Sequence, residues 1–211
     1  MKFTILYNNE AKEGYMSDWG FSCLIEGAGK NILFDTGAKS KGLLFNIDKL
    51  GINPDTIDCV VISHRHFDHA GGLEGLLENI SGTGPEIIQP GKKEAFEICN
   101  GVRSTGTLSS GFFRPDEQSL LVETSQGLVV LVGCSHPGVD TILKTARTLN
   151  SLESNEGIYA IIGGFHGFHK LEELEGIEYI GACHCTRHMK DIEKKFPRNF
   201  HHIHAGDIIE I

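Results

Sequence analysis

The sequence predicts an α/β (α+β) fold, and three observations lead to this prediction. Short apolar segments rich in β-branched residues alternate with segments whose apolar residues recur every three or four positions, as in amphipathic helices. Apolar residues make up 40% of the 211-residue chain, which is enough to fill a substantial core. The chain has no internal repeat and no low-complexity linker, so we expect residues 1–211 to form a single domain.

The first third of the chain is predicted to be rich in β-strands, which turn-type residues such as Gly27–Lys30 separate. Helices are expected where apolar residues share one helical face. The strand expected at Asp58–Ser63 is a continuous apolar run, which is typical of a strand buried on both faces. The expected strands are Lys2–Asn8, Phe21–Glu26, Asn31–Asp35 and Asp58–Ser63, and the expected helices are Ser40–Leu50 and Gly72–Ile80.

The rest of the chain continues this alternation. The Gly- and Ser-rich segment Asn100–Pro115 is predicted to be a long exposed loop of the kind that lines binding sites. Thr124–Gly127 has the composition of a hairpin turn. The expected strands are Glu86–Gln89, Gln118–Glu123, Leu128–Val132, Ile158–Ile162, Glu178–Ala182 and two short strands within His201–Ile211 broken at Gly206; the expected helices are Lys92–Cys99, Val139–Leu149 and Met189–Phe196.

Composition and charge exclude several classes of protein. No run approaches the ~18 apolar residues that a membrane helix needs, and no secretory signal is visible at the N-terminus, so we expect no membrane association. The six scattered cysteines are then expected to be reduced thiols, which predicts a cytoplasmic protein. The net charge of −9 argues against nucleic acid as a partner and leaves a small molecule as the expected substrate.

Histidines are distributed unevenly and point to a metal site. All eleven lie from His64 onward, and the segment Ser63–Gly72 contains three of them together with Asp68. His64 and His66 are two residues apart at the end of a buried strand, so their side chains project to the same side. Asp68 and His69 follow in the turn into the next helix, where they can face a second metal. Imidazole and carboxylate ligands suit Zn²⁺, Fe²⁺ or Mn²⁺.

This segment resembles the hallmark motif of the metallo-β-lactamase superfamily. Ile32–Gly37 and the hairpin strand Gly127–Gly133 are similar to two other parts of that superfamily, in the expected order. The resemblance implies a four-layer αββα sandwich that holds two divalent metal ions, most commonly zinc. Four further segments resemble the branch related to dihydropteroate synthase, named for 7,8-dihydropterin-6-methyl-4-(β-D-ribofuranosyl)aminobenzene 5′-phosphate synthase: Trp19–Glu26, Gly133–His136, Gly163–His166 and His184–Thr186.

Further candidate ligands lie at the ends of later strands. His136 and His184 each follow an apolar strand, so both are expected to bind metal together with His64, His66, Asp68 and His69. His166 has a similar place and either binds metal or supports a ligand. Cys134 stands near the position of the superfamily's bridging aspartate, and it either binds metal or is a buried core residue. Asp35 is expected to accept a hydrogen bond from a ligand histidine.

Other residues have weaker assignments. Arg187 replaces the glycine that this branch usually has after His-Cys-Thr, and it is a candidate for binding a phosphate or carboxylate, as are Arg103 and Arg114 of the Gly/Ser-rich segment. Cys183-x-Cys185 is not expected to form a separate structural zinc site, because the chain has no second cysteine pair to complete one. His201-His202-x-His204 is expected to be surface or sheet-edge histidine.

The expected function is that of a metal-dependent enzyme with Asp68 as its catalytic carboxylate. In a hydrolytic reaction, water attacks an ester, lactone or phosphoester and Asp68 orients it. The resemblance implies instead a transfer in which pyrophosphate leaves a pterin methylene. A non-catalytic metal-dependent binding or sensor protein is the alternative. Diiron electron-transfer relatives carry Glu at the second His of the motif, and His66 at that position argues against that subgroup.

Overall fold

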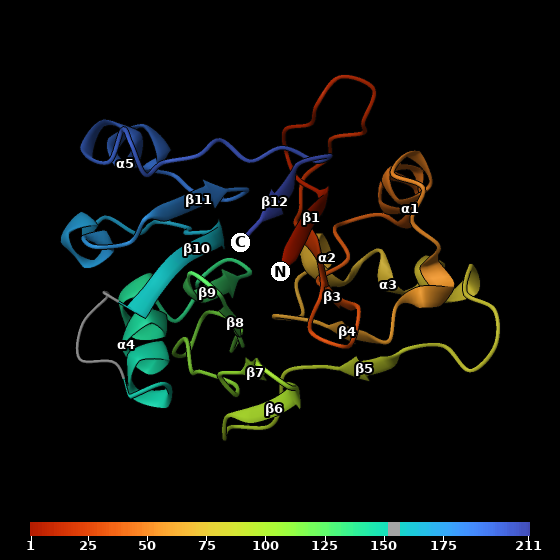
Figure 1. Ribbon diagram of the computed structural model, residues 1–211, viewed down its shortest axis with the longest axis horizontal. Helices are drawn as coiled ribbons and strands as arrows, with labels where there is room; N and C mark the ends of the chain where they lie inside the picture. Colours follow the sequence, from red (N-terminus) through yellow and green to blue (C-terminus); the bar gives the residue numbers. More distant parts are fainter. Residues whose placement is uncertain (152–156) are drawn as a thin grey trace. The chain divides into compact units, whose positions relative to one another are not determined.

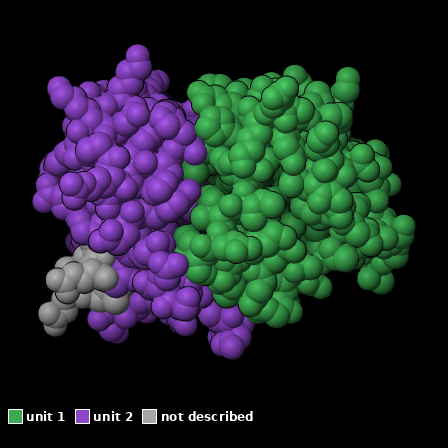
Figure 2. Space-filling view, turned by 45° about the horizontal axis from the view of Figure 1, so that its top comes forward, with its two compact units in different colours: residues 1–89, 203–211 green, residues 90–202 purple. Residues whose placement is uncertain are grey.

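The computed structural model describes residues 1–151 and 157–211, which form two compact units (Figures 1 and 2). Unit 1 comprises residues 1–89 and 203–211, and unit 2 comprises residues 90–202. Each unit contains a six-stranded sheet with helices, so the predicted α/β fold class is confirmed. The single domain expected from the sequence stays a prediction.

The sheet of unit 1 has the strand order β12-β1-β2-β3-β4-β5. The pairs from β12 to β3 are antiparallel, whereas β3, β4 and β5 run parallel. Phe34 at the end of β3 lies opposite Val61 at the end of β4, so the residues that follow both strands leave the same edge. The strands are β1 Lys2–Tyr7, β2 Ser22–Glu26, β3 Ile32–Phe34, β4 Cys59–Val61, β5 Glu86–Ile88 and β12 Ile208–Glu210.

Short helices pack on the sheet of unit 1. Leu43 and Ile47, one turn apart on the first helix, share a buried cluster with Leu6 and Leu33 of the strands. Asn46 on the same helix donates hydrogen bonds to the carbonyls of Leu6 (2.8 Å) and Met16 (2.9 Å), so polar as well as apolar contacts hold the helix against β1. The elements are α1 Ser40–Lys49, η1 Pro54–Thr56, α2 Phe67–Ala70 and α3 Leu73–Glu78.

The sheet of unit 2 has the order β11-β10-β9-β8-β7-β6, with β9, β10 and β11 parallel and the other pairs antiparallel. The apolar face of helix α4 packs on this sheet, beside β10 in Figure 1. The elements are β6 Phe96–Cys99, β7 Val102–Ser104, β8 Leu120–Thr124, β9 Gly127–Val132, α4 Val139–Leu149, β10 Ile158–Gly164, η3 Leu171–Leu174, β11 Tyr179–Cys183 and α5 Met189–Lys195.

Two sequence predictions are wrong between residues 92 and 115. Lys92–Cys99 is not a helix, because Phe96–Cys99 pairs antiparallel with Val102–Ser104 across the two-residue turn Asn100-Gly101. Gly101 adopts φ +75°, and Asn-Gly between two short strands is a strong hairpin signal that the helical spacing obscured. Asn100–Pro115 is therefore not one exposed loop, since its first part is turn and strand and only its later residues are mainly exposed.

The other expected elements are confirmed to within a few residues. At the C-terminus, the two expected strands are one strand, β12, and a single bridge between Ala205 and Ala11. Gly206 lies between them with φ +93°, at the break that the sequence indicated. Among the described residues, no helix is long and apolar enough to span a membrane.

The pairing of β9 with β10 depends on Gly163. This residue has φ +131°, and a Cβ atom built on it would lie 1.9 Å from the carbonyl oxygen of Val132. We expect Gly163→Ala to lower the free energy of unfolding by about 3 kcal/mol or more, because backbone strain adds to the clash. Urea unfolding followed by circular dichroism measures this loss. Gly91→Ala is the control, since nothing lies within 4 Å of its added Cβ; an equal effect of both changes would contradict the prediction.

Candidate metal centre

The carboxylate of Asp35 organises the candidate residues of unit 1. Asp35 is fully buried directly after β3 and adopts φ +60°, a conformation that non-glycine residues rarely hold. Its Oδ1 accepts a hydrogen bond from the backbone N–H of Ser63 (2.7 Å). Its Oδ2 accepts one from the Ser63 hydroxyl (2.7 Å) and lies 2.6 Å from Nδ1 of His69. One carboxylate therefore holds two segments of the His-x-His-x-Asp-His loop.

This network fixes which nitrogen each histidine exposes. An ionised carboxylate only accepts hydrogen bonds, so His69 donates its Nδ1–H to Asp35 and keeps the lone pair on Nε2. The Ser63 hydroxyl donates its hydrogen bond to Asp35, so its oxygen is left to accept a hydrogen bond from Nδ1 of His64 at 2.9 Å. His64 then also keeps its lone pair on Nε2. Both fully buried imidazoles are thus prepared as metal ligands through the same atom.

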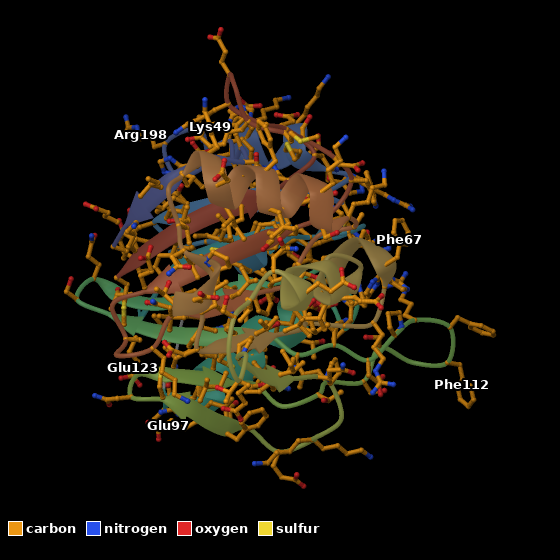
Figure 3. All side chains as sticks on the ribbon, turned by 90° about the vertical axis from the view of Figure 1, so that its right-hand side faces the viewer. Lys49, Phe67, Glu97, Phe112, Glu123 and Arg198 are labelled. Atoms are coloured by element: carbon orange, nitrogen blue, oxygen red, sulfur yellow. The ribbon has the colours of Figure 1, made fainter. Side chains whose placement is uncertain are left out.

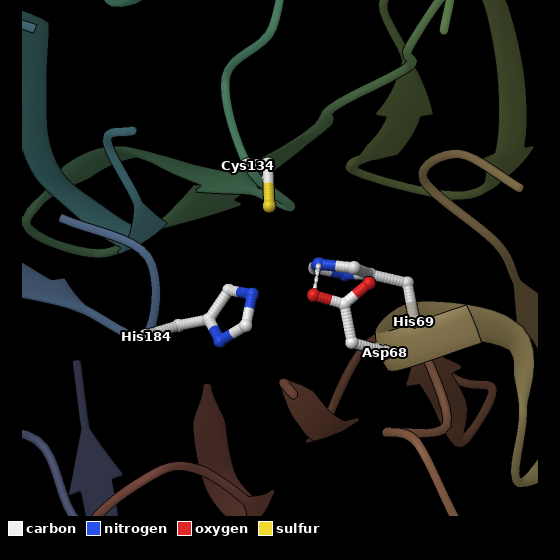
Figure 4. Close-up of side chains that lie close together, drawn as sticks. All are labelled: Asp68, His69, Cys134 and His184. Atoms are coloured by element: carbon white, nitrogen blue, oxygen red, sulfur yellow. Dashed lines mark ion pairs between the residues drawn. The ribbon is translucent and has the colours of Figure 1, made fainter. Parts of the chain in front are cut away.

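His66 and Asp68 complete this group. His66 precedes α2, and its Nδ1 lies 3.2 Å from Nε2 of His64. Asp68 is buried in the first turn of α2, where its Oδ2 accepts a hydrogen bond from Nε1 of Trp19 at 2.8 Å. The same oxygen lies 3.9 Å from Nε2 of His69, the pair joined by the dashed line in Figure 4. Unit 1 therefore brings together the four residues of the motif.

The candidate residues of unit 2 follow three parallel strands. Cys134 and His136 come after β9, His166 after β10 and His184 after β11, and parallel strands present their carboxyl ends at one edge. Ser135, His166 and His184 have φ values of +57°, +44° and +50°. Such backbone conformations cost of order 1–3 kcal/mol each and cluster at functional sites. The strain indicates that these turns are shaped to direct side chains.

Contacts within unit 2 bring most of these side chains together. A ligand atom of Cys134 lies within 4.8 Å of one from His184, and likewise of one from His136. Figure 4 shows the Cys134 sulfur and the His184 ring, which come from different loops. The rings of His136 and His166 have centroids 5.1 Å apart. Cys134 is buried, as either of its expected roles requires.

A buried carboxylate without a distinctive sequence pattern holds the loop after β9. Glu117 is fully buried, and its Oε1 accepts the backbone N–H groups of Gly133 (3.0 Å), Cys134 (2.9 Å) and Ser135 (3.0 Å). Its Oε2 accepts the N–H of His136 at 2.9 Å. Four charge-assisted hydrogen bonds therefore fix the loop that carries two candidate ligands. Trp19 and Ser63 were also missed, because neither residue type signals a metal site by itself.

The three candidate arginines have different surroundings. Arg103 lies in β7, where its guanidinium donates to the carbonyl of Leu149 (3.2 Å) and to Glu123 (3.5 Å). These structural contacts occupy its guanidinium. Arg187 is exposed, and its backbone N–H donates to the carbonyl of His166 at 2.8 Å. Arg114 lies in the exposed part of the loop before β8.

The three histidines near the C-terminus contact residues outside the candidate ligand set. His201 stacks on Tyr179 with ring centroids 4.0 Å apart, and His202 pairs with Glu193 at 3.2 Å. His204 contacts Glu10 and Asp207. Burial lowers the pKa of His201, which favours its neutral form. These contacts match the surface and sheet-edge role that the sequence indicated. No disulfide joins the six cysteines, all of which lie within the described residues.

Comparisons with known proteins agree with the sequence motifs. The model of the Metallo-beta-lactamase superfamily matches residues 20–84. The chain is 27% identical over 267 residues to 7,8-dihydropterin-6-methyl-4-(beta-D-ribofuranosyl)-aminobenzene-5'-phosphate synthase of Methanocaldococcus jannaschii, covering 93% of this chain and 91% of the relative. It is 36% identical over 64 residues to ribonuclease Z of Aeropyrum pernix, covering 30% and 20% of the two chains.

A solved structure extends the likeness to the whole chain. The crystal structure of a metal-dependent hydrolase of the β-lactamase superfamily has a TM-score of 0.78 and 27% identity, covering 100% of this chain and 99% of that one. The chain therefore has the metallo-β-lactamase α/β sandwich fold. The resemblance to this superfamily and to its dihydropterin synthase branch is confirmed.

Replacing Glu117 tests its role in positioning the loop. We expect Glu117→Gln to lower the free energy of unfolding by about 2–4 kcal/mol, because the amide would turn an N–H₂ group toward one of the four backbone donors. Bound metal should fall with it, since supports of ligands typically affect affinity ~10–100-fold. Thermal unfolding and metal analysis measure both effects.

Glu123→Gln is the matched control for this change. Glu123 is an exposed residue of β8 that contacts Arg103 at 3.5 Å, so its replacement should change stability by less than about 0.5 kcal/mol. Wild-type stability and metal content in Glu117→Gln would show that the loop does not depend on the buried charge.

Proposed function

We propose that this chain of the metallo-β-lactamase fold is a metal-dependent enzyme that acts on a small anionic substrate containing a phosphate or ester. The proposed ligands of two divalent ions, most simply Zn²⁺ with Fe²⁺ or Mn²⁺ as substitutes, are His64, His66, Asp68, His69, His136 and His184. The observation that carries the proposal is the hydrogen-bond network of Asp35, Ser63, His64 and His69, which prepares two imidazoles as ligands.

The donor atoms of unit 1 fit a zinc ion. Two nitrogen ligands at ~2.0–2.1 Å from a tetrahedral zinc lie ~3.3 Å apart. Nε2 of His64 and Nδ1 of His66 are separated by 3.2 Å, which is compatible with a shared ion. In unit 2, a thiolate at Cys134 would be a further strong zinc ligand near His136 and His184. Cys134 and His166 stay candidates either for direct binding or for support of a ligand.

The residues of the chain divide the work of the proposed reaction. Bound divalent ions supply Lewis-acid polarisation of a substrate oxygen and acidify water. Asp35 keeps two histidines in the tautomer that binds metal. Asp68, held by the Trp19 indole, is proposed to orient the attacking group and to accept its proton. The indole hydrogen bond keeps the Asp68 carboxylate from rotating, so its second oxygen has a defined direction.

The same proposed ligands and the same carboxylate, Asp68, are compatible with either hydrolysis or group transfer. The likeness to a solved metal-dependent hydrolase supports hydrolysis, and the likeness to the methanogen synthase supports a pterin-related reaction that forms a phosphate-bearing product. The net charge of −9 favours a small-molecule substrate over nucleic acid. The six scattered cysteines, which the structure does not join in disulfides, support a reducing, cytoplasmic location.

Metal content is the first test of the proposal. The purified protein should contain one to two transition-metal ions per chain, and His64→Ala combined with His66→Ala should remove most of one ion, because both donors of the 3.2 Å pair are lost. Mass spectrometry of the metals measures the ratio. His202→Ala is the control, since this histidine lies on the surface beside Glu193. Full occupancy in the double variant would refute the ligand assignment.

Activity after replacement of Asp68 is the second test. Pterin pyrophosphate, phosphodiester, lactone and thioester substrates should be screened with the matching metal. We expect Asp68→Asn to lower turnover at least ~100-fold while the fold is retained, because the amide cannot accept a proton. Asp48→Asn, on an exposed position of α1, should leave turnover unchanged. Metal binding without turnover of any substrate would favour a sensor or binding protein instead.

A further inference from the structure

A pocket of about 220 Å³ lies within unit 2, beside the beginning of α4. Its walls come from Ser135 after β9, Gly138 and Asp140 at the start of α4, and residues 165–170 after β10. Arg114 closes one side from the loop before β8. Pockets that enclose a whole drug-sized ligand measure ~300–1,000 Å³, so this one has room for one end of a substrate.

The charged groups of the pocket favour an anion. Lys170 lies 2.6 Å from the Asp140 carboxylate. Burial raises the pKa of Asp140, but the hydrogen bond and charge of Lys170 outweigh this and hold it below its usual value. These two charges therefore compensate each other, and Arg114 adds a positive charge to the lining. A guanidinium offers two parallel N–H donors, which match phosphate oxygens.

The pocket adjoins the candidate ligands of unit 2. Ser135, which lines it, lies in the chain between Cys134 and His136. His166 also lines it, and its ring lies 5.1 Å from that of His136. A molecule that places one end in the pocket therefore has its next atoms beside these histidines.

The sides of the pocket suit the body of such a molecule. The rings of Phe165 and Phe168 contribute to the lining and pack edge to face, with centroids 6.4 Å apart. Arg114 directly follows Phe112 and Phe113, whose rings are fully exposed at the tip of the loop, as Figure 3 shows for Phe112. Phe165 and Phe168 therefore give the pocket an aromatic side, as in sites for ring-bearing ligands.

We propose that this pocket binds the terminal phosphate of a phosphomonoester substrate, with Arg114 as the principal contact. The assignment of the phosphate to a substrate rests on the proposed function. The binding of phosphate rests on the pocket alone. Arg114 is then a specificity residue that distinguishes phosphorylated from unphosphorylated substrates.

Calorimetric titration with ribose 5-phosphate, using ribose as the uncharged counterpart, tests this site in the full-length protein as purified. We expect ribose 5-phosphate to bind and ribose not to bind. Arg114→Gln should weaken binding roughly tenfold or more, because a charge-assisted hydrogen bond is lost. Arg198→Gln removes the same charge from an exposed position outside the pocket and should have no effect. Equal affinities of the two variants would overturn the proposal.

A third variant separates this site from the proposed metal centre. His64→Ala combined with His66→Ala should bind ribose 5-phosphate within twofold of wild type if the phosphate occupies the pocket. If this variant loses binding while Arg114→Gln binds with wild-type affinity, the phosphate binds to metal. That result would refute phosphate binding in the pocket and leave the proposed function intact. If the wild type contains no metal but its binding of ribose 5-phosphate still depends on Arg114, the proposed function is refuted. The proposal that the pocket binds phosphate is then supported.

Discussion

Each group of candidate ligands is held by a buried carboxylate surrounded by hydrogen-bond donors. Asp35 in unit 1 and Glu117 in unit 2 are both fully buried. A buried charge is costly unless it is compensated, so the donors around each carboxylate cannot be withdrawn without a large loss of stability. In both cases the donors belong to the segment that carries the histidines. The requirement to satisfy the charge therefore fixes the geometry of the loops.

The two carboxylates act in different ways. Asp35 contacts the imidazole of His69 directly and that of His64 through Ser63, so it sets ring orientation and tautomer. Glu117 contacts only backbone N–H groups of residues 133–136, so it sets the course of the chain and leaves the side chains to be directed by it. Replacing Asp35 is expected to change the tautomer of the candidate ligand histidines. Replacing Glu117 is expected to change where the candidate ligands lie.

Backbone strain accumulates where the strands end. Of the five described non-glycine residues with positive φ, four lie within three residues of a strand end at the candidate sites: Asp35, Ser135, His166 and His184. Such turns reverse the chain sharply, which brings a side chain back over the strand ends. The hydrogen bonds that Asp35 and Ser135 share with buried carboxylate networks offset part of this strain.

The sequence by itself determined the alternation of strands and helices, the fold class and the histidine motif, because these depend on local periodicity and on spacing within ten residues. It failed at Lys92–Cys99, where pairing with a neighbouring strand outweighed helical spacing. It also had no means of selecting Glu117, since a glutamate before a strand has no distinctive local pattern. Only the tertiary structure decided which carboxylate holds which loop and which arginine lines a pocket. Those outcomes depend on contacts between residues far apart in the chain, such as Glu117 with Gly133–His136 and Arg114 with residues 165–170, whose closeness no short segment encodes.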